Sequence, residues 1–224
     1  MMGDFDDNYV RDSSTQGVTV QATGTVKVVP DGVSFNFAVS VLAQSSETAM
    51  SDASATAEKV RAALDAAGVA KDDIATQNVS VYPEYVSSTT GTQTLTGYRA
   101  QQIFTVTLRD TAKAGEVVDA VIAAGGNSLQ VYGVTPTLLD TDAAVAQARE
   151  AAIKSAKSKA KDYASLVDAG LGSVVYISEV ASPSSPVPML AGDSATASAP
   201  MAKTEINLGT QEVSVSVEVR WSLD

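Results

Sequence analysis

The chain has 224 residues, of which 45% are hydrophobic and 18% are charged, and its formal net charge is −11 at pH 7. This length allows a substantial core, and the acidic balance argues against nucleic acid as a partner, because binding to a phosphate backbone requires a basic surface. Cysteine and histidine are both absent, which excludes disulfides, thiolate chemistry, Ser-His-Asp catalysis and the usual zinc, copper and haem ligands.

The N-terminal residues 1–16 are acidic and are predicted to form a flexible arm, followed by a single domain over residues 17–224. Asp4, Asp6 and Asp7 lack the Gly and terminal Glu of a calcium loop, so we interpret them as a solvated tail. The arm lacks the apolar stretch of a signal peptide, and no run of apolar residues is long enough for a transmembrane helix. We therefore expect a periplasmic, cell-envelope or secreted protein if an export segment was removed, and a cytoplasmic one otherwise.

Alternating apolar residues begin at Val18 and continue to Val28, and they resume from Val33 to Val41. Pro30, Asp31 and Gly32 form a strong turn signal between the two runs. This pattern predicts a β-hairpin with one buried face.

The next segments predict a helix, a strand pair and a second helix. Ser45 or Ser46 is expected to cap a helix that ends near Ala67, and Pro83 marks an edge or a bend in the strand that follows. A polar hairpin tip at 87–97 leads to a return strand over 98–108. A helix capped by Thr111 is expected to end at Gly125 and Gly126 and to bury Val117, Val118, Val121 and Ile122; a strand over 128–137 follows.

Residues 141–170 predict a long helix, because the segment has no internal Gly or Pro before Gly170 and is rich in Ala and Lys. Asp140, Thr141 and Asp142 are expected to cap its start, and Gly170 is expected to stop it. The predicted buried stripe comprises Val145, Ala148, Ala152, Ala156, Ala160, Tyr163, Ala164 and Val167.

The C-terminal part predicts a strand over 174–181, a Pro/Ser/Ala-rich loop at 182–203 and a final strand that alternates cleanly from Val213 to Trp221. The order is therefore ββ-α-ββ-α-β-α-ββ, which is typical of an α+β fold of mostly antiparallel sheet with helices packed on one face. An Ala-Gly pair ends each of the three helices, which suggests an internal repeat; a simple preference for Gly after helices is the alternative.

The residues indicate no catalytic, cofactor-binding or metal site, and we expect a protein that is not an enzyme and needs no cofactor. Asp140 and Asp142 could hold a cation, but a helix cap explains them more simply. Lys154, Lys157 and Lys161 lie partly on one helix face, which could dock an anionic partner or be a solvated face.

The second faces of the strands are polar but almost uncharged, which is unusual for a solvated sheet. Such a face fits packing on a second sheet, a subunit interface or a water-filled lumen, and ordinary solvent exposure is the alternative. We expect self-assembly. The residues on these faces are Thr19, Gln21, Thr23, Thr25, Ser34, Asn36, Gln101, Thr105, Thr107, Ser214 and Ser216.

Motifs spread over the chain resemble the SIMPL family, formerly a domain of unknown function. The matching segments are VTVQATGTVKVVPDGVSF, AGVAKDDIATQNVSVYPEY, GYRAQQIFTVTLRD, INLGTQEVSVSVEVRWSL and the stretch from Ala148 to Glu179. The family includes periplasmic immunogenic proteins and an oxidative-stress-associated protein. The resemblance implies an exported α+β domain that forms large ring- or channel-like homo-oligomers, a loose link to stress defence, and no catalytic residues to transfer.

Three functions follow as hypotheses. The first is a non-enzymatic envelope protein that assembles into a ring, shell or channel with copies of itself, and association with a membrane or the envelope stays open. The second is a module that binds a small, unidentified ligand in a pocket between helices and sheet, lined by Tyr82, Tyr85 and Tyr98. The third is an enzyme that uses carboxylates and a metal.

Overall fold

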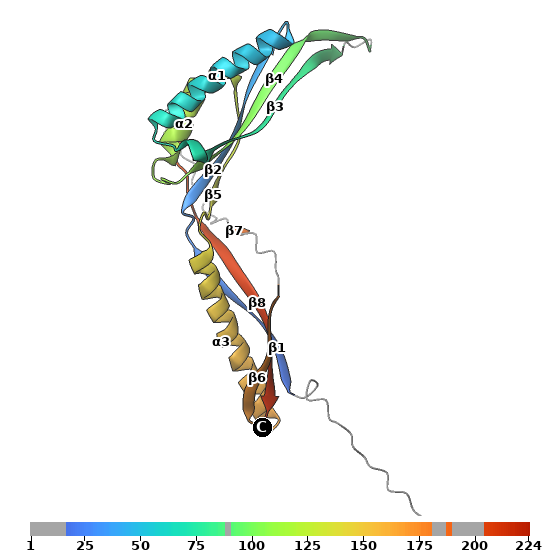
Figure 1. The fold of residues 1–224 in the computed structure, drawn as a ribbon, viewed down its shortest axis with the longest axis vertical. Helices are drawn as coiled ribbons and strands as arrows, with labels where there is room; N and C mark the ends of the chain where they lie inside the picture. Colours follow the sequence, from blue (N-terminus) through green and yellow to red (C-terminus); the bar gives the residue numbers. More distant parts are fainter. Residues whose placement is uncertain (1–16, 88–90, 181–186, 190–203) are drawn as a thin grey trace, which may run out of the picture. The chain divides into compact units, whose positions relative to one another are not determined.

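A computed structural model describes residues 17–87, 91–180, 187–189 and 204–224. Its elements confirm the α+β class, with antiparallel sheets, and they divide into two compact units (Figure 1). The central unit comprises residues 29–140 and 190–210, and the terminal unit comprises residues 1–28, 141–189 and 211–224. We predicted a single domain over residues 17–224. This remains a prediction for the two units.

The central unit contains a sheet in the order β3-β4-β2-β5, covered on one face by two helices. Phe35, Phe37 and Phe104 are fully buried between the sheet and the helices, where Phe37 stacks on Phe104 with the ring centroids 5.3 Å apart. The elements are β2 (Gly32–Ala43), α1 (Ser46–Ala66), β3 (Ile74–Ser87), β4 (Gln93–Leu108), α2 (Ala114–Gly125) and β5 (Leu129–Thr137), with 3₁₀ turns at Lys71–Asp73 and Gly126–Ser128.

The terminal unit contains a sheet in the order β1-β8-β6, and helix α3 shares a hydrophobic core with β1 and β8. The elements are β1 (Val18–Val28), α3 (Asp142–Leu166), β6 (Leu171–Val180), β7 (Val187–Met189) and β8 (Thr210–Leu223). The short strand β7 pairs with β8 and falls within the predicted loop at 182–203, most of which lies outside the described residues. The alternating residues of β8 from Val213 to Trp221 are buried as predicted.

The predicted hairpin over residues 18–41 is wrong. β1 pairs with β8 along its whole length, from Val18 opposite Trp221 to Val28 opposite Gln211, whereas β2 pairs with β4 and β5. The alternation of apolar residues correctly predicts that each strand buries one face, but it does not indicate which strand is its hydrogen-bonding partner. The turn at Pro30 instead passes the chain from one sheet to the other.

The predicted helix limits are partly correct. Ser45 caps α1, since its hydroxyl accepts a hydrogen bond from the Thr48 backbone N–H at 3.1 Å, and Gly68 follows the helix with a φ of +83°. Thr111 does not cap α2: the helix begins at Ala114 and has no side-chain capping hydrogen bond. Just before the helix, the Lys113 N–H donates to the Asp110 carboxylate at 3.3 Å. The predicted burial of Ile122 is also wrong, because this residue is 43% exposed.

The ends of α3 differ from the prediction as well. Thr141 precedes the helix without a side-chain capping hydrogen bond, and the chain leaves the helix through Asp168, whose φ is +55°, rather than at Gly170. Gly170 instead exchanges two backbone hydrogen bonds with Asp224, both of 2.9 Å. The buried stripe is narrower than expected: Tyr163 and Val167 are exposed, and only alanines at every fourth position from Ala144 to Ala164 are buried.

Candidate assembly surface

In the described part of the chain, β1 and β6 flank the central strand β8 as the outer strands of the terminal unit's sheet, and the short strand β7 also pairs with β8. β1 keeps an unbroken register with β8 over eleven residues and contains no proline, and its single charged residue is Lys27. An edge strand with these properties offers backbone N–H and C=O groups to another strand.

β6 is the more apolar of the two edges. Val174, Val175, Tyr176, Ile177 and Val180 are between 44% and 56% exposed, and Glu179 is the one charged residue of the strand. The register with β8 shifts near Val174 and is regular from Tyr176 to Val180. Successive side chains of a strand point to opposite faces, so Tyr176 and Ile177 expose apolar groups on both sides of this edge.

The edges of the central unit's sheet are built differently. β3 contains Pro83 and two register shifts against β4, and β5 contains Pro136 and one shift against β2. Prolines and bulges are the usual devices that prevent a sheet edge from pairing with another chain. β6 also has two register shifts against β8, between Leu171 and Tyr176, but neither β1 nor β6 contains a proline, and β1 has no shift. By these criteria the edges of the terminal unit's sheet, β1 above all, are better suited to assembly.

Helix α3 covers one face of this sheet, and Lys159 of this helix donates a hydrogen bond to the Gln21 backbone carbonyl of β1 at 3.3 Å. Its buried alanines allow close approach to β1, and a Cβ built on Gly24 would lie 2.1 Å from the Ala148 carbonyl oxygen. Glu179 of β6 accepts hydrogen bonds from Arg149 of α3 at 2.7 and 3.3 Å, and these bonds lower the pKa of the Glu179 carboxyl and raise that of the Arg149 guanidinium. The charge on β6 is thereby neutralised within the chain.

The neutral polar faces form hydrogen-bonded pairs across the strands. In the terminal unit, Thr23 pairs with Ser216 at 2.8 Å and Thr25 pairs with Ser214 at 3.0 Å. In the central unit, Thr105 donates to Asn36 at 2.7 Å. These hydroxyls and amides satisfy one another, which explains why the faces need few charges; their predicted role in self-assembly stays a prediction.

The three tyrosines expected to line one pocket do not lie on one face. Tyr82 pairs with Arg99 and is exposed, whereas Tyr98 packs on the core cluster beneath the helices, and Tyr85 is exposed near the end of the hairpin. Their separation follows from the register of β3 with β4, in which Tyr82 lies opposite Arg99 and Tyr98 lies opposite Pro83; alternation within a single strand does not reveal this register.

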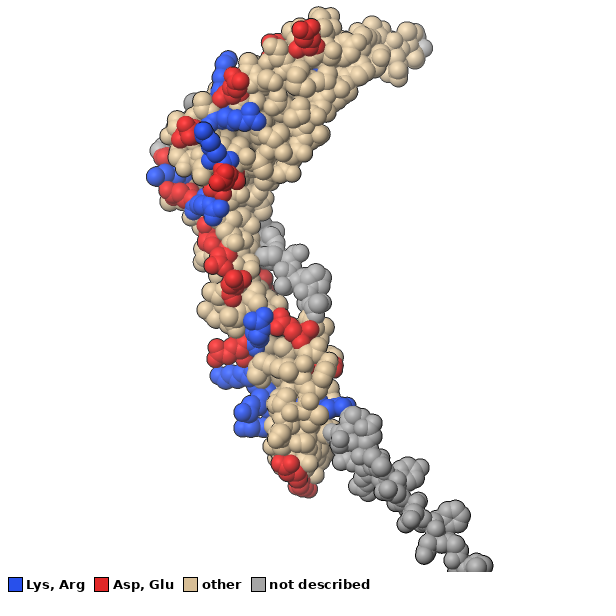
Figure 2. All heavy atoms as spheres, viewed as in Figure 1, with Lys and Arg blue, Asp and Glu red and all other residues tan. Residues whose placement is uncertain are grey.

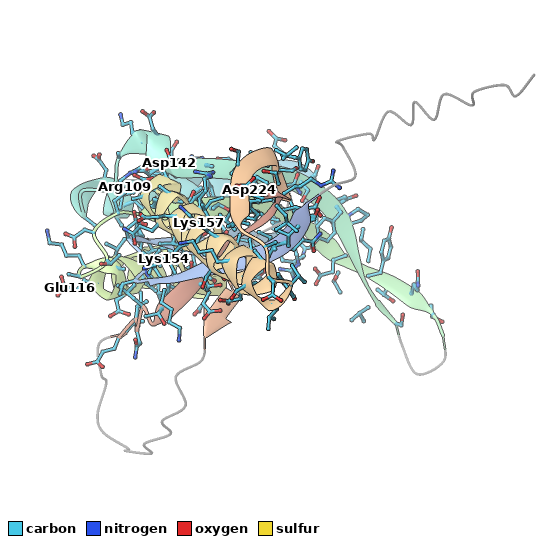
Figure 3. The ribbon with its side chains drawn as sticks, turned by 90° about the horizontal axis from the view of Figure 1, so that it is seen from below. Arg109, Glu116, Asp142, Lys154, Lys157 and Asp224 are labelled. Carbon is cyan, nitrogen blue, oxygen red and sulfur yellow. The ribbon has the colours of Figure 1, made fainter. Side chains whose placement is uncertain are left out.

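The other candidate residues do not gather into a site. Lys154, Lys157 and Lys161 are exposed on α3, and Figure 3 shows the first two extending from the helix. Within the described ranges, no group of three or more acidic residues is placed to hold a metal ion, and Asp140 and Asp142 are both exposed. Asp4, Asp6 and Asp7 lie outside the described residues. No helix in the described part of the chain is long and apolar enough to cross a membrane.

Sequence comparison identifies the family. The SIMPL profile, described as a protein of unknown function (DUF541), matches residues 18–221. The chain belongs to the SIMPL family. It is 30% identical to the 26 kDa periplasmic immunogenic protein of Brucella melitensis over 211 residues, which cover 90% of this chain and 82% of that protein. It is 31% identical to the uncharacterized protein YggE of Escherichia coli K12 over 185 residues, covering 81% and 74% of the two chains.

The SIMPL match spans both compact units, so the family domain includes the β1 and β6 edges as well as the helix-covered central sheet. The family description names no reaction. The β6 edge was missed at the sequence level, although the unbroken apolar run from Val174 to Ile177 was a signal: a strand with one solvated face should alternate.

Proposed function

We propose that this SIMPL protein is a non-enzymatic component of the periplasm or cell envelope that assembles with copies of itself into a ring-like homo-oligomer. The compartment is supported by the Brucella relative, whose name describes it as periplasmic. The observation that carries the assembly is the pair of outer strands on one sheet, the apolar β6 and the regular β1, each of which pairs only with β8 among the described strands.

The direction of the strands favours a closed ring over a simple dimer. β1 and β6 both run antiparallel to β8, and they are therefore parallel to each other. Joining β6 of one copy to β1 of the next keeps each copy in the same orientation and leaves one β1 and one β6 free at the ends. A contact between two different surfaces repeats from copy to copy; it gives a ring where the rotation between copies closes, and an open filament where it does not.

The apolar side chains supply the driving force for this contact. Covering Tyr176, Ile177 and Val180 removes apolar surface from water, and backbone hydrogen bonds along the strand fix the partner's direction. Glu179 does not oppose the approach, because Arg149 of the same chain already neutralises it. The link to oxidative-stress defence stays a prediction of family resemblance.

Cysteine cross-linking tests the arrangement, since the chain has no cysteine of its own. Thr23 of β1 and Val180 of β6 both lie opposite Ser216, so within one chain β8 separates them by two strand spacings, about 10 Å, which is too far for a disulfide. Chains with Thr23→Cys are mixed with chains carrying Val180→Cys, or Ser178→Cys as a second position on the same face, and are then oxidised.

Head-to-tail pairing predicts a covalent dimer in the mixture and none in either variant alone. A dimer formed by the β6 variants alone would show that β6 pairs with β6, which overturns the ring. Absence of a dimer at both β6 positions, in a sample that remains folded by circular dichroism, would overturn the pairing of these edges.

A small-ligand module is the second candidate, and one observation favours it. Arg61, Asp65 and Lys71 line an open pocket of about 370 Å³ together with Ala62, Val69 and Ile74, beside the end of α1. A thermal-shift screen tests this function, because a molecule that binds only the folded state raises the melting temperature. Loss of that shift in Arg61→Gln would assign the binding to this pocket, and a screen without a stabilising molecule would count against the module.

A further inference from the structure

The pocket beside the end of α1 combines charges of both signs with an apolar wall. Arg61 and Lys71 supply two cations, and Asp65 supplies one carboxylate. All the lining residues belong to the central unit, and the volume of about 370 Å³ lies at the small end of the range for ligand pockets. The apolar wall is formed by Ala62, Val69 and Ile74.

The Arg61 guanidinium is held in place by two other residues of the unit. Its central carbon lies 5.0 Å from the centroid of the Phe104 ring, and one of its terminal nitrogens donates to the Thr76 hydroxyl at 3.2 Å. A cation above an aromatic ring is attracted by the negative face of the ring. These contacts leave further N–H groups of the guanidinium for a ligand, and its planar geometry matches that of a carboxylate.

Asp65 is not used by Arg61, although the two residues are spaced to meet. Residues at positions i and i+4 of a helix lie on the same face, with Cβ atoms about 5–6 Å apart, and opposite charges at this spacing attract. The Arg61 guanidinium instead contacts Phe104 and Thr76, and in the described part of the chain Asp65 and Lys71 take part in no ion pair. The last turn of α1 also contains no basic residue, so the negative end of its dipole is available to a cation.

We propose that this pocket binds a free aliphatic amino acid through its two charged main-chain groups. The proposal assigns a ligand class to the small-ligand function described above, and it rests on that function. The ligand carboxylate binds Arg61 and Lys71, its ammonium group binds Asp65 near the end of α1, and its side chain packs on the apolar wall.

The mixture of charges favours a zwitterion over a simple ion. A simple anion would leave the Asp65 carboxylate without a partner, and a simple amine would leave both cations without one. Figure 2 shows acidic and basic side chains interspersed over the part of the central unit where α1 ends, in that view. A ligand without net charge is also not repelled by a chain whose net charge is −11.

Isothermal titration calorimetry of the full chain with leucine tests the proposal. We expect leucine to bind, and isocaproate, which lacks the ammonium group, and leucine amide, which lacks the carboxylate, to bind at least about tenfold more weakly, because each loses one charge-assisted contact. Glycine should also bind more weakly, because it has no aliphatic side chain to bury. The proposal is overturned if leucine does not bind, or if either analogue binds as tightly as leucine. A stabilising molecule of another class would then leave the small-ligand function standing with a different ligand.

Substitution of the exposed Asp65 locates the binding in the pocket. Asp65→Asn should reduce the affinity for leucine to that for isocaproate, whereas Lys71→Gln should weaken both ligands. Glu58→Gln is the matched control, because Glu58 is an exposed acid of α1 outside the pocket lining, and its affinity for leucine should equal that of the unchanged chain. An Asp65→Asn chain that still prefers leucine to isocaproate as strongly as the unchanged chain does would overturn the proposal.

Discussion

Gly24 of β1 and Ala148 of α3 lie in direct backbone contact, with no room for a side chain between them. A Cβ on Gly24 would lie 2.1 Å from the Ala148 carbonyl oxygen and 2.3 Å from the Ala152 nitrogen. This approach explains why α3 buries only alanines, because larger residues at these positions would hold the helix away from the strand. The terminal unit therefore depends on small residues on both sides of one interface.

Gly24→Ala should destabilise the protein by about 1–3 kcal/mol or more, because the added methyl group collides with helix backbone that cannot rotate away. Thermal and urea unfolding measure this loss. Gly133→Ala in β5 is the control: a Cβ there meets nothing within 4 Å, and its effect should stay within about 0.5 kcal/mol. Equal effects of the two substitutions would contradict the close packing.

Ser45→Ala should cost about 1 kcal/mol, since it removes the hydroxyl that accepts from the Thr48 N–H. Thr141→Ala at the start of α3 should cost only a few tenths of a kcal/mol, because Thr141 makes no side-chain capping bond. Urea unfolding of the two variants compares them directly. A larger loss of stability for Thr141→Ala than for Ser45→Ala would contradict a side-chain capping bond at Ser45 and its absence at Thr141.

Asp73 and Arg109 should make the central unit sensitive to acid. Arg109 donates to both Asp73 oxygens at 2.8 to 3.2 Å, and these hydrogen bonds lower the pKa of the Asp73 carboxyl below its ordinary value. An acid with a depressed pKa in the folded state stabilises that state above its unfolded pKa, near 3.9, and this contribution disappears as the pH falls through the folded value.

Arg109→Gln should therefore raise the pKa of Asp73 and reduce stability at neutral pH, and the difference from the unchanged chain should shrink below about pH 4. NMR titration of the carboxyl carbon measures the pKa, and denaturation at several pH values measures the stability. An Asp73 pKa that is the same with and without Arg109 would contradict the pairing.

The sequence predicts which segments form helices and strands better than it predicts which strands pair with one another. Apart from the short strand β7, the order of helices and strands follows from local periodicity and is confirmed. The alternation of β8 and the Ser45 cap are confirmed as well. The partner of β1 could not be predicted in the same way, because Val18 pairs with Trp221 at the opposite end of the chain. Such a contact depends on the whole fold, whereas a periodic pattern reports only which face is buried.

Local sequence patterns also failed to predict the C-terminal end of α3 and the exposure of individual side chains such as Tyr163. Asp168 adopts a positive φ that is favoured by glycine, although Gly170 is only two residues away, because Gly170 is paired with Asp224. Tyr163 continues the helical period of α3 but extends past the narrow alanine contact and stays exposed. The candidate assembly surface was missed for a related reason: periodicity identifies β6 as a strand but does not show that its outer edge is free.

Ile177→Lys should weaken assembly strongly, because it places a charge on the free edge of β6 where the next copy is expected to pair. Ile177 is 56% exposed, so the change should leave the folded chain intact. Val131→Lys is the matched control, since Val131 is 44% exposed on β5, whose edge contains Pro136. Disassembly by both substitutions to the same extent would argue against a specific role for β6.

Sedimentation velocity of the purified chain at micromolar concentration tests the proposed assembly most directly. A ring joined through β1 and β6 predicts a single species many times the 23.0 kDa mass of the chain, which Ile177→Lys converts to monomer while Val131→Lys leaves it unchanged. A clean 23.0 kDa monomer for the unchanged chain at these concentrations would contradict the assembly.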